Sequence, residues 1–119
     1  MNLPFFSIIL LTYDWIERLK NAIASVYNQT FNDWVLIIVN DASSDGTYEY
    51  LEKIKSNNIR VVHNKQNLYK GGARNAGIEQ ATGKYICFLD DDDFYLENHL
   101  DIYYNAIKTK GEPLAAWYS

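Results

Sequence analysis

Two short and almost uninterrupted apolar segments near the start of the chain constrain its fold more than any other feature. They are Phe5–Thr12 and Trp34–Asn40, and both are rich in β-branched residues. Apolar side chains at nearly every position are typical of strands that are covered on both faces of a parallel sheet. Segments 59–63 and 84–89 repeat the pattern, the first weakly and the second strongly. The sequence therefore predicts a parallel sheet with helices on both faces.

Helical patterns separate these predicted strands. Between Trp15 and Tyr27, apolar residues recur at spacings of three and four, which is the stripe of a helix that packs on a sheet. Further helices are predicted at 48–54, 72–81 and about 96–111, and Gly83 is read as a left-handed cap after the third of them. Leu114–Tyr118 is read as the opening of a fifth strand. The expected fold is a Rossmann-like α/β domain over residues 1–119, which suits the length of one domain.

Charge and cysteine content exclude several functional classes. The chain has 15 acidic and 11 basic residues and a net charge of −4, so nucleic-acid binding is disfavoured. Cys87 is the single cysteine and cannot form an internal disulfide, which favours a reducing compartment. No apolar run approaches the length of a membrane span, which is about 18 residues. We therefore expect a cytoplasmic location, free or at the membrane surface.

Four consecutive carboxylates, Asp90–Asp93, follow the most apolar part of the fourth predicted strand. Two like charges about 4 Å apart repel by roughly 4 kcal/mol at an effective dielectric near 20, so such a cluster in a cleft needs a cation or must take up protons. Oxygen ligands suit Mg²⁺ or Mn²⁺, which also bind substrate phosphate. The alternative is a solvated acidic loop that favours the N-terminus of the following helix. The position at a buried strand end favours the metal.

The segment Asn40–Thr47 ends the second predicted strand and begins a helix. Ser44 is expected to cap that helix and Asp45 to stabilise its first turn. This leaves Asp41 free at the strand end, where its carboxylate can accept hydrogen bonds from a base or a ribose. Helix capping alone explains Ser44 and Asp45. A ligand-binding role for Asp41 and a purely structural role for the segment therefore both stay open.

An aromatic residue and an arginine complete the candidate set. Tyr13 follows the first strand, where it can stack on a nucleobase or simply pack in the loop. Arg74 follows two glycines at a predicted helix start, a setting suited to phosphate oxygens as well as to an ordinary turn. His63 and His99 have no partner pattern and are read as structural or solvent-facing.

Four segments taken in order carry a resemblance to a known family. They are Ser7–Tyr13, Asn40–Thr47, Gly72–Gly77 and Gly83–Asp93. Together they resemble the N-terminal, nucleotide-binding half of a family 2 glycosyltransferase of the GT-A fold. The fold implied is a GT-A sheet that ends after its fourth or fifth strand. The activity implied is transfer of a sugar from a metal-bound nucleotide diphosphate sugar to an acceptor hydroxyl, with inversion at the sugar C1. A UDP-sugar is the donor that we expect.

The resemblance also implies roles for single residues. Thr12 and Tyr13 match residues around the base, and Asp41 matches the carboxylate that reads it. Arg74 matches an arginine near the nucleotide or pyrophosphate. Asp90 and Asp92 match an Asp-x-Asp pair, with Asp92 as the metal ligand for Mg²⁺ or Mn²⁺ and Asp90 nearer the ribose. Asp91 is placed with the substrate-binding residues.

The sequence departs from the family pattern at two positions and in its extent. Asn40 stands where the family usually has an acid before Asp41, and Asp14 stands where asparagine is commoner. Family members continue into a half that forms the acceptor site and supplies the general base, so no catalytic base is assigned here. The acceptor expected is a saccharide or a lipid-linked molecule. An unfinished sheet edge at Leu114–Tyr118 predicts self-association and no sugar transfer by this chain alone.

Two other functions remain open at this point. A metal–nucleotide-sugar binding module without catalysis would use the same residues. A phosphoacceptor receiver domain would also hold Mg²⁺ with strand-end acids, but it gives the Gly72–Asn75 segment no role. A dehydrogenase is disfavoured because no G-x-G-x-x-G follows a strand. A nucleotidyltransferase is disfavoured because the loop after the first strand contains no glycine.

Overall fold

Four strands and four helices alternate along residues 3–110, the part of the chain that the computed structural model describes. In chain order they are β1 (Phe6–Thr12), α1 (Ile16–Tyr27), β2 (Trp34–Asn40), α2 (Thr47–Ile54), β3 (Ile59–His63), α3 (Tyr69–Glu79), β4 (Tyr85–Asp90) and α4 (His99–Thr109). The predicted α/β class is confirmed. The predicted strand Leu114–Tyr118 lies outside the described residues.

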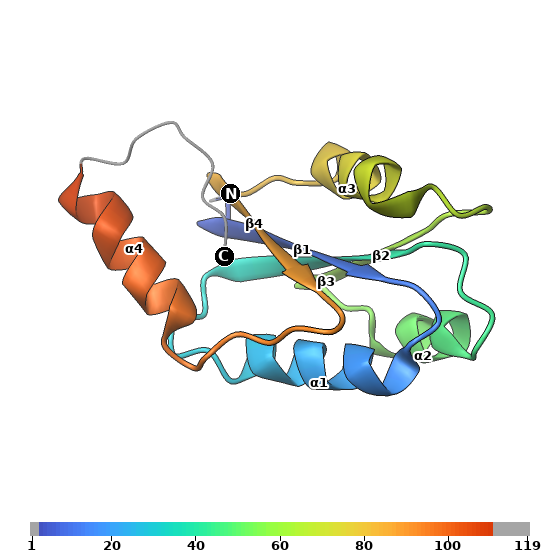
Figure 1. Ribbon diagram of the computed structural model, residues 1–119. Coiled ribbons are helices and arrows are strands. Elements are labelled where there is room, and N and C mark those ends of the chain that lie inside the picture. The colour runs from blue at the N-terminus through green and yellow to red at the C-terminus, as the bar shows by residue number, and fades with distance from the viewer. Residues whose placement is uncertain (1–2, 111–119) are drawn as a thin grey trace.

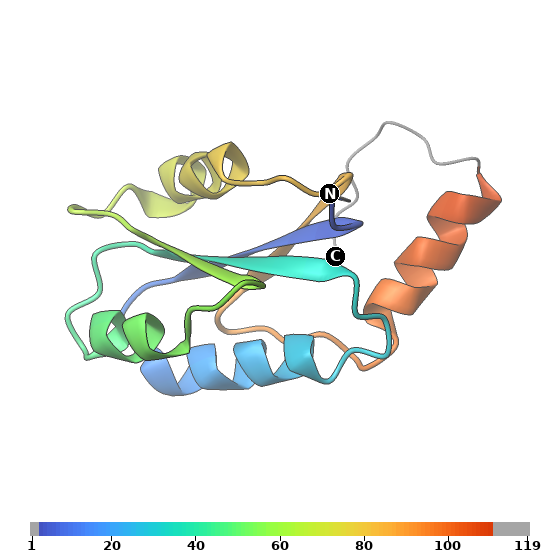
Figure 2. The ribbon, with the colours of Figure 1, turned by 180° about the vertical axis from the view of Figure 1, so that it is seen from behind.

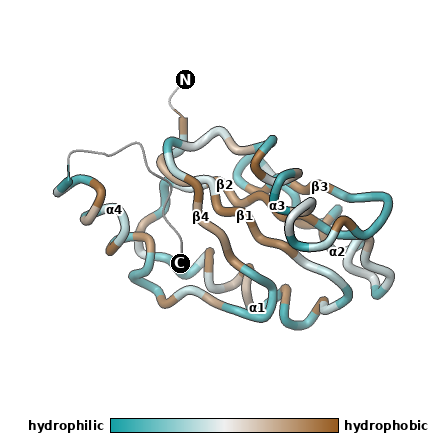
Figure 3. Tube along the Cα trace, turned by 45° about the horizontal axis from the view of Figure 1, so that its top comes forward, coloured by the Kyte–Doolittle hydropathy of each residue, from teal (hydrophilic) through white to brown (hydrophobic). Residues whose placement is uncertain are grey.

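The four strands form one parallel sheet in the order β3-β2-β1-β4 (Figure 1). All seven residues of β1 and all seven of β2 are buried, as expected for central strands with cover on both faces. In β4 buried and half-buried residues alternate, because this strand lies at an edge of the described sheet. The strands are the most hydrophobic stretches of the tube in Figure 3.

The helices cover the two faces unequally. α3 alone lies on one side of the sheet and α1 and α2 lie on the other, as Figures 1 and 2 show from opposite directions. The face under α3 is built on Ile9, Ile37 and Val39, which pack with Ala73. The larger cluster on the other face contains side chains from α1, α2 and α4. α4 lies near the amino ends of the strands, so the carboxyl ends remain open (Figure 1).

One loop glycine differs from its predicted role. Gly83 does not adopt the left-handed conformation of a helix cap. A Cβ at this position would lie 2.6 Å from the backbone nitrogen of Ser7 and 2.8 Å from the carbonyl carbon of Phe6. Its amide donates a hydrogen bond of 2.8 Å to Ser7 Oγ. Gly83 is therefore required by a close approach to the central strand, and the cap prediction was wrong.

None of the helices in residues 3–110 combines the length and the apolar character that crossing a bilayer needs. Burial raises the pKa of the Cys87 thiol to about 12, so this cysteine is an inert core residue of β4.

Candidate nucleotide site at the strand ends

A cleft of about 250 Å³ opens at the carboxyl ends of β1, β2 and β4 and the start of α3. We call it the strand-end cleft. In a parallel α/β sheet this edge is where ligands bind. Six of the seven residues predicted for the site line it: Thr12, Tyr13, Asp41, Asp90, Asp91 and Asp92. The structure thus brings together residues that are up to 80 positions apart in the chain.

The Asp41 carboxylate is buried and holds the start of α3. Its Oδ1 accepts hydrogen bonds from the Asn64 side-chain amide at 2.9 Å and from the Leu68 backbone N–H at 2.8 Å. Its Oδ2 accepts one from the Tyr69 backbone N–H at 2.9 Å. The expectation that this carboxylate is free was therefore wrong. A carboxylate offers about four acceptor positions, so one remains on Oδ2.

Asp41 also explains why α3 begins earlier than predicted. The first N–H groups of a helix lack partners within the helix, and an acceptor at that end stabilises it. Asp41 supplies this acceptor from the end of β2, 28 residues before Tyr69. The helix therefore starts at Tyr69 and includes Gly71 and Gly72, which were predicted to precede or open it.

Thr12 and Asp91 form a pair across β1 and the end of β4. The Thr12 hydroxyl donates to Asp91 Oδ2 at 3.0 Å, and the Tyr13 backbone N–H donates to the same oxygen at 3.3 Å. Burial raises the pKa of the Asp91 carboxyl. These two hydrogen bonds oppose the rise, and the neighbouring Asp92 and Asp90 charges add to it. The Thr12 side chain is itself buried, so its direct partner is Asp91.

The acidic run does not converge on one point. Among the described residues, no group of three or more acidic, histidine or cysteine side chains could hold a metal ion. Asp90 Oδ2 lies 3.5 Å from Lys70 Nζ, and Asp91 is engaged with β1. Asp92 is exposed at the rim of the cleft, whereas Asp93 does not line it. Because Mg²⁺ commonly takes only one or two carboxylates beside water and phosphate, Asp92 with one neighbour still fits such an ion.

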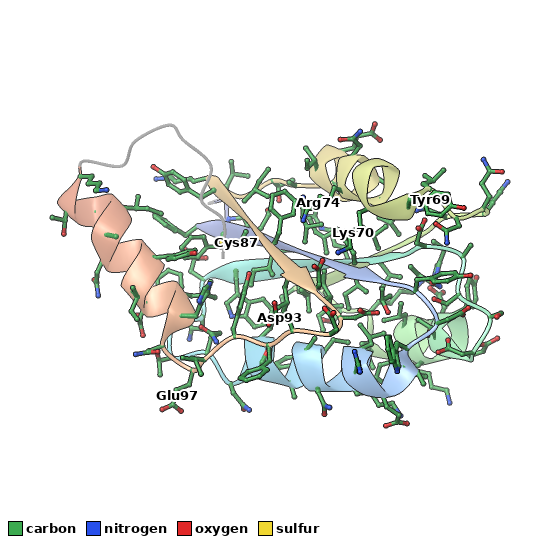
Figure 4. All side chains as sticks on the ribbon, in the orientation of Figure 1. Tyr69, Lys70, Arg74, Cys87, Asp93 and Glu97 are labelled. Carbon is green, nitrogen blue, oxygen red and sulfur yellow. The ribbon has the colours of Figure 1, made fainter. Side chains whose placement is uncertain are left out.

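The two basic residues of α3 occupy different places. Lys70 lines the cleft, and sequence reasoning did not single it out, although it precedes Arg74 by one helical turn. Arg74 does not line the cleft. Its guanidinium carbon lies 5.0 Å from the centre of the Phe88 ring, and its Nε is buried with no hydrogen-bond partner among the described residues. Figure 4 shows both side chains on the α3 side of the sheet.

Reciprocal hydrogen bonds tie the loop after β1 to the loop after β2. The Asp14 N–H donates to Ser43 Oγ at 2.9 Å, and Asp14 Oδ1 accepts from the Ser44 N–H at 2.5 Å. Asp45 Oδ2 accepts from the N–H of Ile16 at 3.0 Å. Asp14 adopts a φ of 51°, a conformation that Asp tolerates better than most residues. These bonds fix Tyr13 relative to Asp41.

Asp45, rather than Ser44, accepts the hydrogen bonds at the start of α2. Its Oδ1 accepts from the Thr47 N–H at 3.3 Å and from the Thr47 hydroxyl at 2.5 Å, while Gly46 precedes the helix at a φ of 92°. The Ser44 cap prediction was wrong. Burial by itself would raise the pKa of Asp45, but the hydrogen bonds from Thr47 and Ile16 outweigh it and lower the pKa.

Asp45→Asn should therefore destabilise the fold at neutral pH by about 1 kcal/mol, because its amide group cannot accept both sets of hydrogen bonds. A lowered folded pKa means that the stabilisation is complete above the ordinary Asp pKa of about 3.9 and is lost as the pH falls through the folded value. Urea unfolding from pH 6 to pH 2 should show the deficit of the variant shrinking. Glu49→Gln, in the same helical turn, is the control. A deficit that stays constant to pH 2 would contradict this account.

Asn40 and the two histidines are structural. The Asn40 side-chain amide lies 3.0 Å from His63 Nδ1, and its Oδ1 accepts from the Ser43 N–H at 3.0 Å. His63 Nε2 lies 3.0 Å from Glu52 Oε2. His99 stacks on Tyr95 at 4.0 Å between ring centres. An acid at position 40 would lack the amide donor that faces His63, which explains the departure at this position.

Residues 7–117 match the family Glycosyl transferase family 2. A curated relative, the Escherichia coli UDP-Glc:alpha-D-GlcNAc-diphosphoundecaprenol beta-1,3-glucosyltransferase WfgD, is 33% identical over 96 residues, which cover 81% of this chain and 38% of that protein. The Campylobacter jejuni GalNAc(5)-diNAcBac-PP-undecaprenol beta-1,3-glucosyltransferase is 35% identical over 101 residues, which cover 82% of this chain and 33% of that protein.

Solved structures share the fold. S. aureus TarS 1-349 in complex with UDP-GlcNAc superposes with a TM-score of 0.80 at 28% identity, over 87% of this chain and 31% of that one. The mannosyltransferase PcManGT from Pyrobaculum calidifontis, in complex with GDP-Man and Mn²⁺, gives a TM-score of 0.75 at 22% identity, over 92% and 33% of the two chains. This chain spans about two fifths of the length of the first two curated relatives it matches.

Proposed function

Because the chain belongs to glycosyl transferase family 2, we propose that it forms the donor-binding half of a glycosyltransferase that uses a nucleoside diphosphate sugar. The observation that carries the proposal is the composition of the strand-end cleft. Tyr13 and Asp41 line it together with Asp90, Asp91 and Asp92. An aromatic ring with a buried acceptor suits a nucleobase, and carboxylates that can share a cation suit a diphosphate.

The base would lie against Tyr13, whose side chain is half-exposed. The remaining acceptor position on Asp41 Oδ2 would receive an N–H from the edge of the base. Uracil presents an imide N–H of this kind, and TarS is solved in complexes with UDP and UDP-GlcNAc. UDP is therefore the first nucleotide to test, with Thr12 acting through Asp91 rather than by direct contact.

The residues of the acidic run fit a divalent ion that bridges protein and diphosphate. Asp92 would ligate Mg²⁺ or Mn²⁺, and Asp90 or Asp91 would lie beside the ribose or complete the set. Such an ion neutralises charge on the leaving nucleoside diphosphate. Lys70, with its ion pair to Asp90, lies where it can add positive charge near the phosphates. Arg74 is one turn further on and would have to leave the Phe88 ring to do the same.

The acceptor would be a hydroxyl of a saccharide or of a lipid-linked sugar, since the two named relatives carry diphosphoundecaprenol or PP-undecaprenol in their names. Inverting transfer needs a base within hydrogen-bond reach of that hydroxyl. We assign none of the described residues to this role. A cytoplasmic location, free or at the membrane surface, stays a prediction. Self-association through a sheet edge also stays a prediction.

Calorimetric titration of UDP, GDP and ADP into the protein, each with Mn²⁺ and with chelator, tests the proposal. UDP should bind, and Mn²⁺ should tighten the binding. Inorganic pyrophosphate with Mn²⁺ should bind more weakly, because it lacks the base. Absence of binding by every nucleotide would reject the donor-site assignment.

Asp41→Asn should weaken UDP binding about tenfold, because its amide group replaces one charged acceptor by a donor that faces N–H groups. Binding of pyrophosphate with Mn²⁺ should not change. The start of α3 should also lose protection from hydrogen exchange, since the Leu68 and Tyr69 N–H groups bond to this carboxylate. Unchanged UDP affinity together with lost protection would restrict Asp41 to helix capping.

A further inference from the structure

Tyr69 has an unfavourable backbone conformation for its side chain. Its φ is 60°, in the left-handed region, where a bulky residue is an outlier. Two other non-glycine residues of the described chain have positive φ, Asp14 and Ala42, and neither is bulky. Strain of this kind persists where the surroundings hold it in place, and it gathers at ligand sites.

The fold holds the backbone of Tyr69 but does not need its ring. The Tyr69 N–H donates to Asp41 Oδ2 at 2.9 Å and lies 2.8 Å from Asn67 Oδ1. A glycine would make both contacts without strain. The Tyr69 side chain is 75% exposed, the most exposed of the large apolar or aromatic residues described. The ring therefore stabilises no core, and packing does not explain why this position is a tyrosine.

Tyr69 is one of the residues that line the strand-end cleft. Tyr69 lines it from α3, and Tyr13 lines it from the end of β1 (Figure 4 labels Tyr69). Tyr69 bonds to Asp41 directly, and Tyr13 follows Thr12, which also bonds to Asp41. The Asp41 N–H donates to the Thr12 carbonyl, next to Tyr13, at 2.9 Å, and the Asp41 carboxylate accepts from Tyr69. Two exposed aromatic residues thus flank one buried carboxylate.

We propose that Tyr69 is a nucleobase-binding residue, whose ring packs on the base that Asp41 reads and that Tyr13 contacts. This inference rests on the proposed donor site. An aromatic ring can stack on any base, so Tyr69 contributes affinity without selecting the base. Selection comes from the Asp41 carboxylate, which accepts a hydrogen bond from the edge of the base. The strained backbone places a tyrosine rather than a glycine in the lining of the cleft, and a glycine at this position would leave that side of the base open.

Three variants of the purified protein separate a ligand role from a structural one. Tyr69→Gly should weaken UDP binding about tenfold, which is within the range for loss of one stacked ring. Its melting temperature should stay the same or rise, because glycine adopts positive φ freely. Tyr69→Phe should keep wild-type affinity. Tyr69→Ala should lose affinity like the glycine variant and melt lower than it. Pyrophosphate with Mn²⁺ should bind all of them equally.

Each outcome decides the proposal. UDP affinity in Tyr69→Gly equal to that of the wild type would overturn the role of Tyr69 and leave the donor site intact. A marked fall in its melting temperature would overturn the claim that the ring is not needed for folding. Failure of the wild-type protein to bind any nucleotide would overturn the proposed function, and Tyr69 with it.

Discussion

Asp92→Asn should abolish the gain in UDP affinity that Mn²⁺ provides. Asp92 is exposed at the rim of the strand-end cleft, and the structure gives its carboxylate no hydrogen-bond or ion-pair partner among the described residues. A carboxylate in this position can turn to an ion without breaking other bonds. Loss of a charged ligand from a site with one or two carboxylates should weaken Mn²⁺-dependent binding about a hundredfold. Calorimetry with Mn²⁺ and with chelator measures the difference.

Asp93→Asn is the matched control for this experiment. It removes the same charge from the next position, but Asp93 does not line the cleft, and its Oδ1 accepts from the Phe94 N–H at 3.2 Å. Its Mn²⁺ response should equal that of the wild type. Equal losses in both variants would show that the run acts by general charge, and an unchanged Asp92→Asn would reject this residue as the ligand.

Gly83→Ala should destabilise the fold by about 3 kcal/mol. The added Cβ would lie 2.6 Å from the Ser7 nitrogen and 2.8 Å from the Phe6 carbonyl carbon, and both atoms belong to the backbone of the central strand. Backbone of β1 cannot move without disturbing its pairing with β2 and β4. Overpacking of this kind costs about 1–3 kcal/mol, with backbone clashes at the upper end. Urea unfolding measures it.

Gly71→Ala provides the control, since a Cβ at Gly71 meets nothing within 4 Å. Gly71 lies inside α3, where alanine is favoured over glycine by about 1 kcal/mol, so this variant should be as stable as the wild type or more so. If Gly83→Ala were equally harmless, the close approach would not be the reason for glycine at that position.

Sequence patterns predicted the strands well because strands buried on both faces are apolar at nearly every position. Trp34–Asn40 was predicted without error, and Phe6–Thr12 differs from prediction by one residue. Predictions failed where a distant group decides a local structure. The start of α3 depends on Asp41, and the need for glycine at position 83 depends on Ser7 and Phe6. These partners are far away in the sequence, so a local sequence pattern could not predict their contacts.

Six of the residues predicted for the candidate site lie in one cleft, but the sequence did not predict most of their hydrogen bonds. Strand ends of a parallel sheet meet at one edge, which is why six predicted residues share one cleft. The sequence could not show that Asp41 accepts three hydrogen bonds and Asp91 two within the protein, or that Arg74 lies against Phe88. Tyr69 was missed because nothing in a sequence marks a tyrosine that will adopt positive φ.

The sheet order β3-β2-β1-β4 brings together site residues whose contacts span very different lengths of chain. The bond between Asp41 and Tyr69 joins positions 28 apart, whereas the bond between Thr12 and Asp91 joins positions 79 apart. Closing the longer loop costs more chain entropy, and during synthesis β4 leaves the ribosome after β1, β2 and β3. The contacts of Asp41 can thus form while the acidic run is still being synthesised. Under the proposed function, the contacts around the residue assigned to the base would form before those of the carboxylates assigned to the diphosphate.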